Sequence, residues 1–111
     1  ERFAIALAGG KFRVRHWGRI RIVQELRRHN VSEHCIRTAL DAITESDYQR
    51  AIRSLAQKKL EAVSGTDRRK KFYTASRYLI GKGFEPELII SALNELLGET
   101  AGYESFPSGI S

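Results

Sequence analysis

Arginine and lysine dominate the residues of this chain that could do chemistry, and they are concentrated in two blocks. From Lys11 to Arg28 there are seven basic residues and one acidic residue, and from Arg50 to Lys71 there are eight basic and two acidic residues. A basic block is most often only a solvated face. Because the block recurs, we interpret it as a binding surface for an extended polyanion or for a repetitive acidic protein surface.

Two groups of these cations are placed where an anion is favoured. Arg21 and Arg28 are seven residues apart, so they lie two turns apart on one helix face, with Glu25 between them able to hold either arginine. Residues 68 to 71 fall in the first turn of an expected helix, where positive charge opposes the helix dipole until an anion binds. Arginine binds both phosphate and carboxylate, which leaves nucleic acid and acidic protein open as partners. The candidate binding residues are Arg15, Arg19, Arg21, Arg28, Arg68, Arg69, Lys70 and Lys71.

The other reactive side chains form no catalytic or metal-binding pattern. His16, His29 and His34 lack the spacing of metal ligands, and the lone Cys35 falls on an apolar core position. The segment 81–83, Gly-Lys-Gly, lacks the spacing of a phosphate loop and is better explained as the end of a helix. We therefore expect a protein that is not an enzyme and that uses no cofactor, no metal and no small-molecule substrate.

Three aromatic residues lie beside basic residues and could stack on the bases of a nucleic acid. They are Trp17, Tyr73 and Tyr78. Aromatic side chains at helical spacing more often pack in a core. We expect Trp17 to cap a module core and the two tyrosines to pack within one.

The elements that must position these residues repeat after 53 residues. Placing Leu26 on Leu79 also aligns Asn30 with Gly83, and these are the two residue types that most readily take the left-handed conformation ending a helix. The same shift aligns Val31 with Phe84, Cys35 with Leu88, Ile36 with Ile89, Ala39 with Ala92, Leu40 with Leu93 and Ile43 with Leu96. Each copy reads as helix, tight turn, helix, so the chain is predicted to be an array of helical modules.

The sequence predicts an all-α, elongated helical repeat, with a flexible tail at 99–111. Gly9-Gly10 is expected to end the first helix, the segment 11–16 to be a loop or a short extended piece, and the segment 46–49 to be a capping box. The expected helices are 2–7, 17–29, 32–43, 46–63, 67–82 and 86–97.

Composition narrows the class of protein. The chain has 111 residues, of which 41% are hydrophobic and 29% charged, as is ordinary for a soluble globular protein. No apolar run is long enough to span a bilayer, so we expect no membrane partner. A single cysteine excludes an internal disulfide and fits a reducing compartment, and we expect a cytoplasmic protein.

The basic blocks and the repeat together resemble a known family. The stretch from Gly18 to Arg28, GRIRIVQELRR, resembles the central signature of RecX, the bacterial regulator of the RecA recombinase. The stretch from Arg77 to Phe84, RYLIGKGF, is similar to the closing repeat of that family. Ala-Leu follows each stretch, at 39–40 and at 92–93.

RecX proteins have three tandem three-helix modules. The resemblance covers roughly residues 1–97, and it implies that residues 1–44 are the second module, with its first helix truncated, and that residues 45–98 are the third. It further implies a non-enzymatic protein that lies in the groove of the RecA–DNA filament, inhibits its recombinase and ATPase activities, and so modulates recombination and DNA repair. Weak, non-specific affinity for single- or double-stranded DNA is implied as well.

A generic DNA-binding module is the alternative interpretation. In it, one helix-turn-helix unit would read a DNA groove without any dependence on RecA. Asparagine and glutamine, which read base edges, are sparse on the second helix of each unit, at 32–43 and 86–97. Both hypotheses remain open from the sequence.

Overall fold

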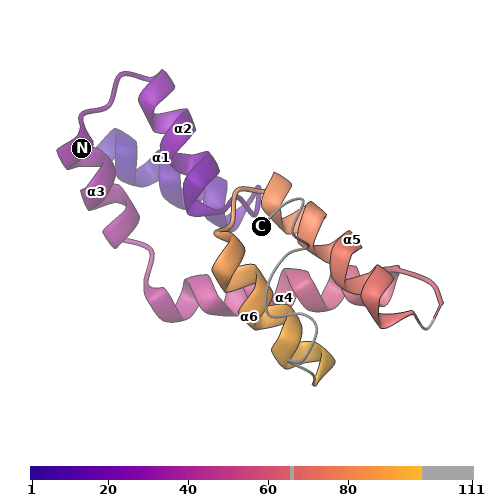
Figure 1. Cartoon of the computed structure of the whole chain (residues 1–111). Helices are drawn as coiled ribbons and strands as arrows, with labels where there is room; N and C mark the ends of the chain where they lie inside the picture. The colour runs from indigo at the N-terminus through magenta and orange to yellow at the C-terminus, as the bar shows by residue number, and fades with distance from the viewer. Residues whose placement is uncertain (66, 99–111) are drawn as a thin grey trace.

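Every regular element that the computed structural model describes, in residues 1–65 and 67–98, is an α-helix. The helices are α1 (Arg2–Arg13), α2 (Arg19–Arg28), α3 (Glu33–Asp41), α4 (Glu45–Ala62), α5 (Arg68–Gly81) and α6 (Pro86–Leu97). They form an elongated molecule of 46 × 26 × 20 Å (Figure 1). The predicted all-α repeat is confirmed, while the predicted flexible tail, 99–111, lies outside the described residues.

The six helices form two groups of three. α1, α2 and α3 pack against one another, and so do α4, α5 and α6, where the second and third helices are in closer contact than α2 and α3 are. Each group has its own fully buried side chains, such as Ala8, Leu26 and Ala39 in the first, and Leu79 and Leu93 in the second. The groups meet at helix ends, where the ring of Phe12 stacks on that of Tyr48 with 5.9 Å between centroids.

The turn that follows α2 has the same geometry as the turn that follows α5. Asn30 has a φ of 61° and Gly83 a φ of 97°, so both take the left-handed conformation that the repeat predicts. The same hydrogen bond closes both turns: from Val31 N to Leu26 O at 3.1 Å, and from Phe84 N to Leu79 O at 3.2 Å. The turns of the two helix-turn-helix units are therefore repeats in structure as well as in sequence.

The predicted end of the first helix at Gly9-Gly10 is wrong, because α1 continues to Arg13. Two glycines inside a helix cost about 2 kcal/mol relative to alanine. Burial of Phe12, one turn later and only 8% exposed, offsets that cost. Gly9 is itself buried, and a Cβ there would lie 2.4 Å from the guanidinium of Arg13, which folds back over it. The segment predicted as a loop is thus half helical.

The capping box predicted at residues 46–49 is also wrong, because α4 begins one position after Thr44. The Thr44 hydroxyl accepts a hydrogen bond from the backbone N–H of Asp47 at 3.1 Å. Thr44 and Ser46 are both suitable caps. Ile43, which is buried, precedes Thr44 directly and fixes the entry into the helix there.

Three smaller observations concern the rest of the fold. Cys35 packs against the core of the first group but is only partly buried, like its counterpart Leu88. The predicted helix from Trp17 begins two residues later, at Arg19. Among the described residues, no helix is both long and apolar enough to cross a membrane.

Candidate functional site

The start of α2 is capped by the other group of helices. No side chain caps α2, whose N-cap residue is Gly18. Instead, Gly18 N donates to Lys82 O at 2.7 Å, and Ile20 N donates to Gly83 O at 2.9 Å. The negative end of α5 thus faces the positive end of α2, which is a favourable arrangement of helix dipoles (Figure 1). The two groups are joined by backbone hydrogen bonds as well as by side chains.

We call this contact between the start of α2 and the turn after α5 the junction. Glycine is required on both of its sides. A Cβ on Gly18 would lie 2.5 Å from the carbonyl carbon of Gly83. A Cβ on Gly83 would lie 2.4 Å from the Cβ of Arg21. No real side chain tolerates such distances without moving the backbone, so the approach of the two groups depends on both glycines.

Tyr48, at the start of α4, links the start of α2 to Glu85, the N-cap residue of α6, through its hydroxyl. The ring is fully buried. Its hydroxyl donates to Glu85 Oε1 at 2.6 Å and accepts from the backbone N–H of Arg19 at 2.8 Å. Burial, together with the hydrogen bond to Glu85, raises the pKa of Tyr48 far above its usual value. The phenol therefore stays protonated and holds α2, α4 and α6 together.

Arg19, one of the predicted binding residues, is a central part of this junction. Its guanidinium lies 3.7 Å from the centroid of the Tyr48 ring and pairs with Glu85 at 3.0 Å and with Glu45 at 2.6 Å. Partial burial disfavours its charge, yet the hydrogen bonds from Arg19 to these two carboxylates raise its pKa. Hydrogen bonds from Gln49 and Arg19 lower the pKa of Glu45. A cation with two carboxylate partners is poorly available to a phosphate.

The remaining predicted residues on and before α2 are exposed but lie apart. Arg15 is exposed in the turn after α1, and Arg21 is exposed on the first turns of α2. Arg28, which is 79% exposed, lies at the other end of α2 and pairs with Glu25 at 3.2 Å. Glu25, which was expected to hold either Arg21 or Arg28, thus pairs with Arg28, and it also lies 3.3 Å from His29.

The second predicted basic group, residues 68–71, lies on the first turn of α5, at the opposite end of the molecule from Arg28 (Figure 1). Asp67 caps this turn and accepts hydrogen bonds from the backbone of Arg69 and Lys70 at 3.1 and 3.3 Å. Arg68 donates to the carbonyl oxygen of Leu97, and Lys71 is partly buried. Arg69 and Lys70 are therefore the members of this group with exposed side chains that have no partner among the described residues.

Beside the junction, the structure brings Arg21 of the predicted set together with three lysines outside that set and with the rings of Trp17 and Tyr78. Lys11 Nζ lies 4.8 Å from the centroid of the Trp17 ring, and the guanidinium carbon of Arg21 lies 4.3 Å from it. Lys59 and Lys82 lie 4.8 and 6.0 Å from the centroid of the Tyr78 ring. We call these six residues the junction platform: Lys11, Trp17, Arg21, Lys59, Tyr78 and Lys82.

The sequence holds a partial signal for this platform. Trp17 and Arg21, and likewise Tyr78 and Lys82, are four residues apart, which is the spacing of neighbours on a helix. The two pairs do not align in the repeat, because the counterpart of Trp17 is Lys70. Only the packing of the two groups places the pairs side by side. Trp17 packs against the core as predicted, but it remains partly exposed.

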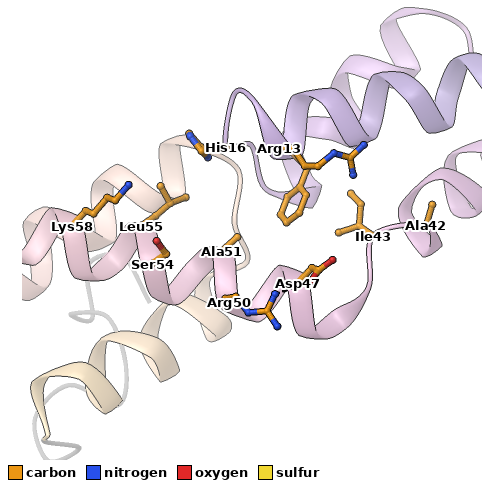
Figure 2. Close-up of a pocket in the computed structure, with 11 residues that line it drawn as sticks. Arg13, His16, Ala42, Ile43, Asp47, Arg50, Ala51, Ser54, Leu55 and Lys58 are labelled. Atoms are coloured by element: carbon orange, nitrogen blue, oxygen red, sulfur yellow. Dashed lines mark hydrogen bonds and ion pairs between the residues drawn. The ribbon is translucent and has the colours of Figure 1, made fainter.

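A groove lies on α4 where it passes the ends of α1 and α3 (Figure 2). Its volume is 410 Å³. The floor is apolar, the rim carries basic side chains, and the one acid, Asp47, pairs with Arg50 at 2.9 Å. The floor contains Phe12, Ile43, Ala51 and Leu55, and the basic rim contains Arg13, His16, Arg50 and Lys58. A smaller hollow, which shares Leu55 and Lys58 with the groove, leads to Tyr78 of the junction platform.

Comparison with known proteins identifies the first group of helices. Residues 1–40 match the family model described as RecX, second three-helix domain. This segment is similar to the second domain of the RecX family. The matched segment holds α1, α2 and most of α3, in the order that a three-helix domain requires. Searches of curated proteins and of solved structures gave no significant match.

The RecX domain contributes only part of the junction platform. Lys11, Trp17 and Arg21 lie in the matched segment, whereas Lys59, Tyr78 and Lys82 come from the second group of helices. The surface therefore exists only when both groups are docked. The capped start of α2, inside the matched segment, is the element that aligns the two groups of helices.

Proposed function

We propose that this chain is a RecX-like regulatory protein that binds RecA–DNA filaments, inhibits recombinase and ATPase activity, and so modulates recombination and DNA repair in the cytoplasm. The observation that carries the proposal is the match of residues 1–40 to the second three-helix domain of RecX. The second group of helices repeats the turn geometry of the first, which supports residues 45–98 as the third module of that family. The protein acts by binding and not by chemistry.

The junction provides a physical reason for two modules to act together. Backbone hydrogen bonds at 2.7 and 2.9 Å and the Tyr48 network fix one module relative to the other. The exposed cations at the end of α2 and at the start of α5 are therefore held at a fixed separation along the molecule. When one end binds a repeating filament, the other end is presented to the next site at a high effective concentration.

Charge reversal on α2 or at the start of α5 is expected to weaken inhibition of RecA strongly. We expect Arg21→Glu with Arg28→Glu, and separately Arg69→Glu with Lys70→Glu, to raise the concentration that halves RecA ATPase activity on single-stranded DNA by at least about tenfold. Exposed charges contribute within about 0.5 kcal/mol to folding, so the thermal melts should be nearly unchanged.

The matched control reverses two exposed arginines outside the candidate set, Arg37→Glu with Arg77→Glu. It changes the net charge by the same amount, so it separates a local contact from a general loss of positive charge. If both candidate variants inhibited like the wild type while folding normally, the two basic ends would be only solubilising surface. If the wild type itself failed to slow RecA ATPase, the proposed function would be wrong.

DNA binding without RecA is expected to be weak, independent of sequence and steeply dependent on salt. The exposed cations contact phosphates, and each neutralised phosphate on a single strand contributes about −0.7 to the slope of log affinity against log salt. Titrating oligonucleotides of several sequences at several salt concentrations measures this slope. Strong preference for one duplex sequence, with a shallow salt slope, would instead favour a helix-turn-helix unit that reads a groove.

A further inference from the structure

We propose that the junction platform is a stacking site for single-stranded nucleic acid, with bases on Trp17 and Tyr78 and phosphates on the cations around them. The proposal rests on the DNA affinity in the proposed function, and it names the strand form and the residues that bind it. None of the predicted basic residues except Arg21 belongs to this site.

The platform is one continuous surface, as the contacts that link its members show. Lys11 and Arg21 lie over Trp17, and Arg21 Nη1 donates to Gly81 O at 3.4 Å. The next residue along the chain, Lys82, lies near the Tyr78 ring, which also has Lys59 over it. The contacts therefore run from α1 through the start of α2 and the end of α5 to α4.

The cations of the platform are available to phosphates. Within the described residues, none of the four, Lys11, Arg21, Lys59 and Lys82, pairs with a carboxylate. Five arginines elsewhere do form such pairs: Arg19, Arg27, Arg28, Arg50 and Arg53. In the free protein these cations lie over the aromatic faces, so a base that stacks on a ring takes the place of a cation, which then contacts the flanking phosphate.

The two rings favour a single strand over a duplex or an acidic protein. An unpaired base offers a planar face that stacks on an aromatic side chain, and its flanking phosphates meet the neighbouring cations. In a duplex the faces are already stacked on each other. A carboxylate-rich peptide would use the cations but not the rings. Trp17 and Tyr78 are both partly exposed, and a hollow of 160 Å³, lined by Leu55, Lys58, Lys59 and Tyr78, leaves room for a planar group beside the Tyr78 ring.

The single tryptophan of the chain makes a direct test possible. An oligodeoxythymidylate is titrated into the full chain at low salt, and the emission of Trp17 is followed together with the anisotropy of a labelled copy of the oligonucleotide. We expect saturable quenching whose midpoint coincides with that of the anisotropy, and reversal of both at high salt. A hairpin duplex of equal charge should bind more weakly and quench less.

Substitutions identify the second ring and its cations. Tyr78→Leu, and separately Lys59→Gln with Lys82→Gln, are each expected to weaken oligonucleotide binding by about fivefold to tenfold. Tyr73→Leu is the control for the ring: it lies on the same helix and stacks edge-on against Phe72 at 5.5 Å. Arg37→Gln with Arg77→Gln is the control for the charge, and both controls should bind like the wild type.

Three results would overturn the platform. They are unchanged Trp17 emission during binding, equal affinity for single strand and duplex, and equal losses in the control and platform variants. Any of them, with RecA ATPase inhibition intact, would leave the proposed function standing and remove only this site. If the oligonucleotide quenched Trp17 while RecA ATPase was not inhibited, the platform would stand and the regulatory function would fall.

Discussion

Replacing Gly83 by alanine is expected to lower the free energy of unfolding by about 3 kcal/mol. The φ of 97° at this residue costs an L-amino acid about 1 to 2 kcal/mol. The added Cβ would also lie 2.4 Å from the Cβ of Arg21, which forces the two modules apart. Because the Gly83 carbonyl accepts the hydrogen bond from Ile20, separation also uncaps α2. Urea denaturation of the full chain measures the loss.

Two other glycines separate the causes of this effect. Gly98 is also left-handed, with a φ of 67°, but a Cβ there meets no atom within 4 Å, so Gly98→Ala should show the backbone strain alone. Gly10 is helical and equally unobstructed, and Gly10→Ala should stabilise the protein by about 0.5 to 1 kcal/mol. Equal losses for Gly83→Ala and Gly98→Ala would show that the close approach of the modules contributes nothing to stability.

Removing a single oxygen atom in Tyr48→Phe is expected to cost about 2 to 3 kcal/mol. The ring and its packing against Phe84, at 5.5 Å between centroids, are retained. The backbone N–H of Arg19 loses its acceptor, and the Glu85 carboxylate loses a donor at 2.6 Å. Tyr73→Phe is the matched control, because the Tyr73 hydroxyl has no hydrogen-bond partner among the described residues. Urea denaturation at neutral pH that gave equal values for both variants would contradict a structural role for the Tyr48 hydroxyl.

The pH dependence of stability offers a second measurement on the same residue. The pKa of Tyr48 is raised in the folded protein above its ordinary value of about 10. Its contribution to stability is therefore complete below pH about 10 and is lost as the pH rises further, because only the unfolded chain ionises the phenol there. The wild type should lose more stability than Tyr48→Phe between pH about 9 and 11. Parallel curves for the two proteins would contradict the raised pKa.

The sequence alone determined the repeat and most of the helix ends, because these depend on local chemistry. Asn30 and Gly83 end their helices since they adopt a left-handed conformation at low cost. Pro86 begins α6 where the first turn needs no N–H, and the boundaries 86–97 are as predicted. Ser32 caps α3 through a hydrogen bond from Cys35 N at 3.2 Å. The basic blocks were also visible in the sequence, and the signature around α2 showed the similarity to RecX that the match of residues 1–40 supports.

Only the tertiary structure decided how the modules meet and which cations remain available. Gly9-Gly10 does not end α1, because burial of the next turn outweighs a local preference for breaking the helix. Arg19 is held at the junction by the carboxylates of Glu45 and Glu85, which are 26 and 66 residues away in the sequence. Local sequence patterns cannot predict contacts over such separations. The junction platform likewise draws on α1, α4 and α5, together with Trp17 and Arg21 around the start of α2. Local patterns set the helices, whereas the candidate site depends on backbone contacts between modules that two glycines allow.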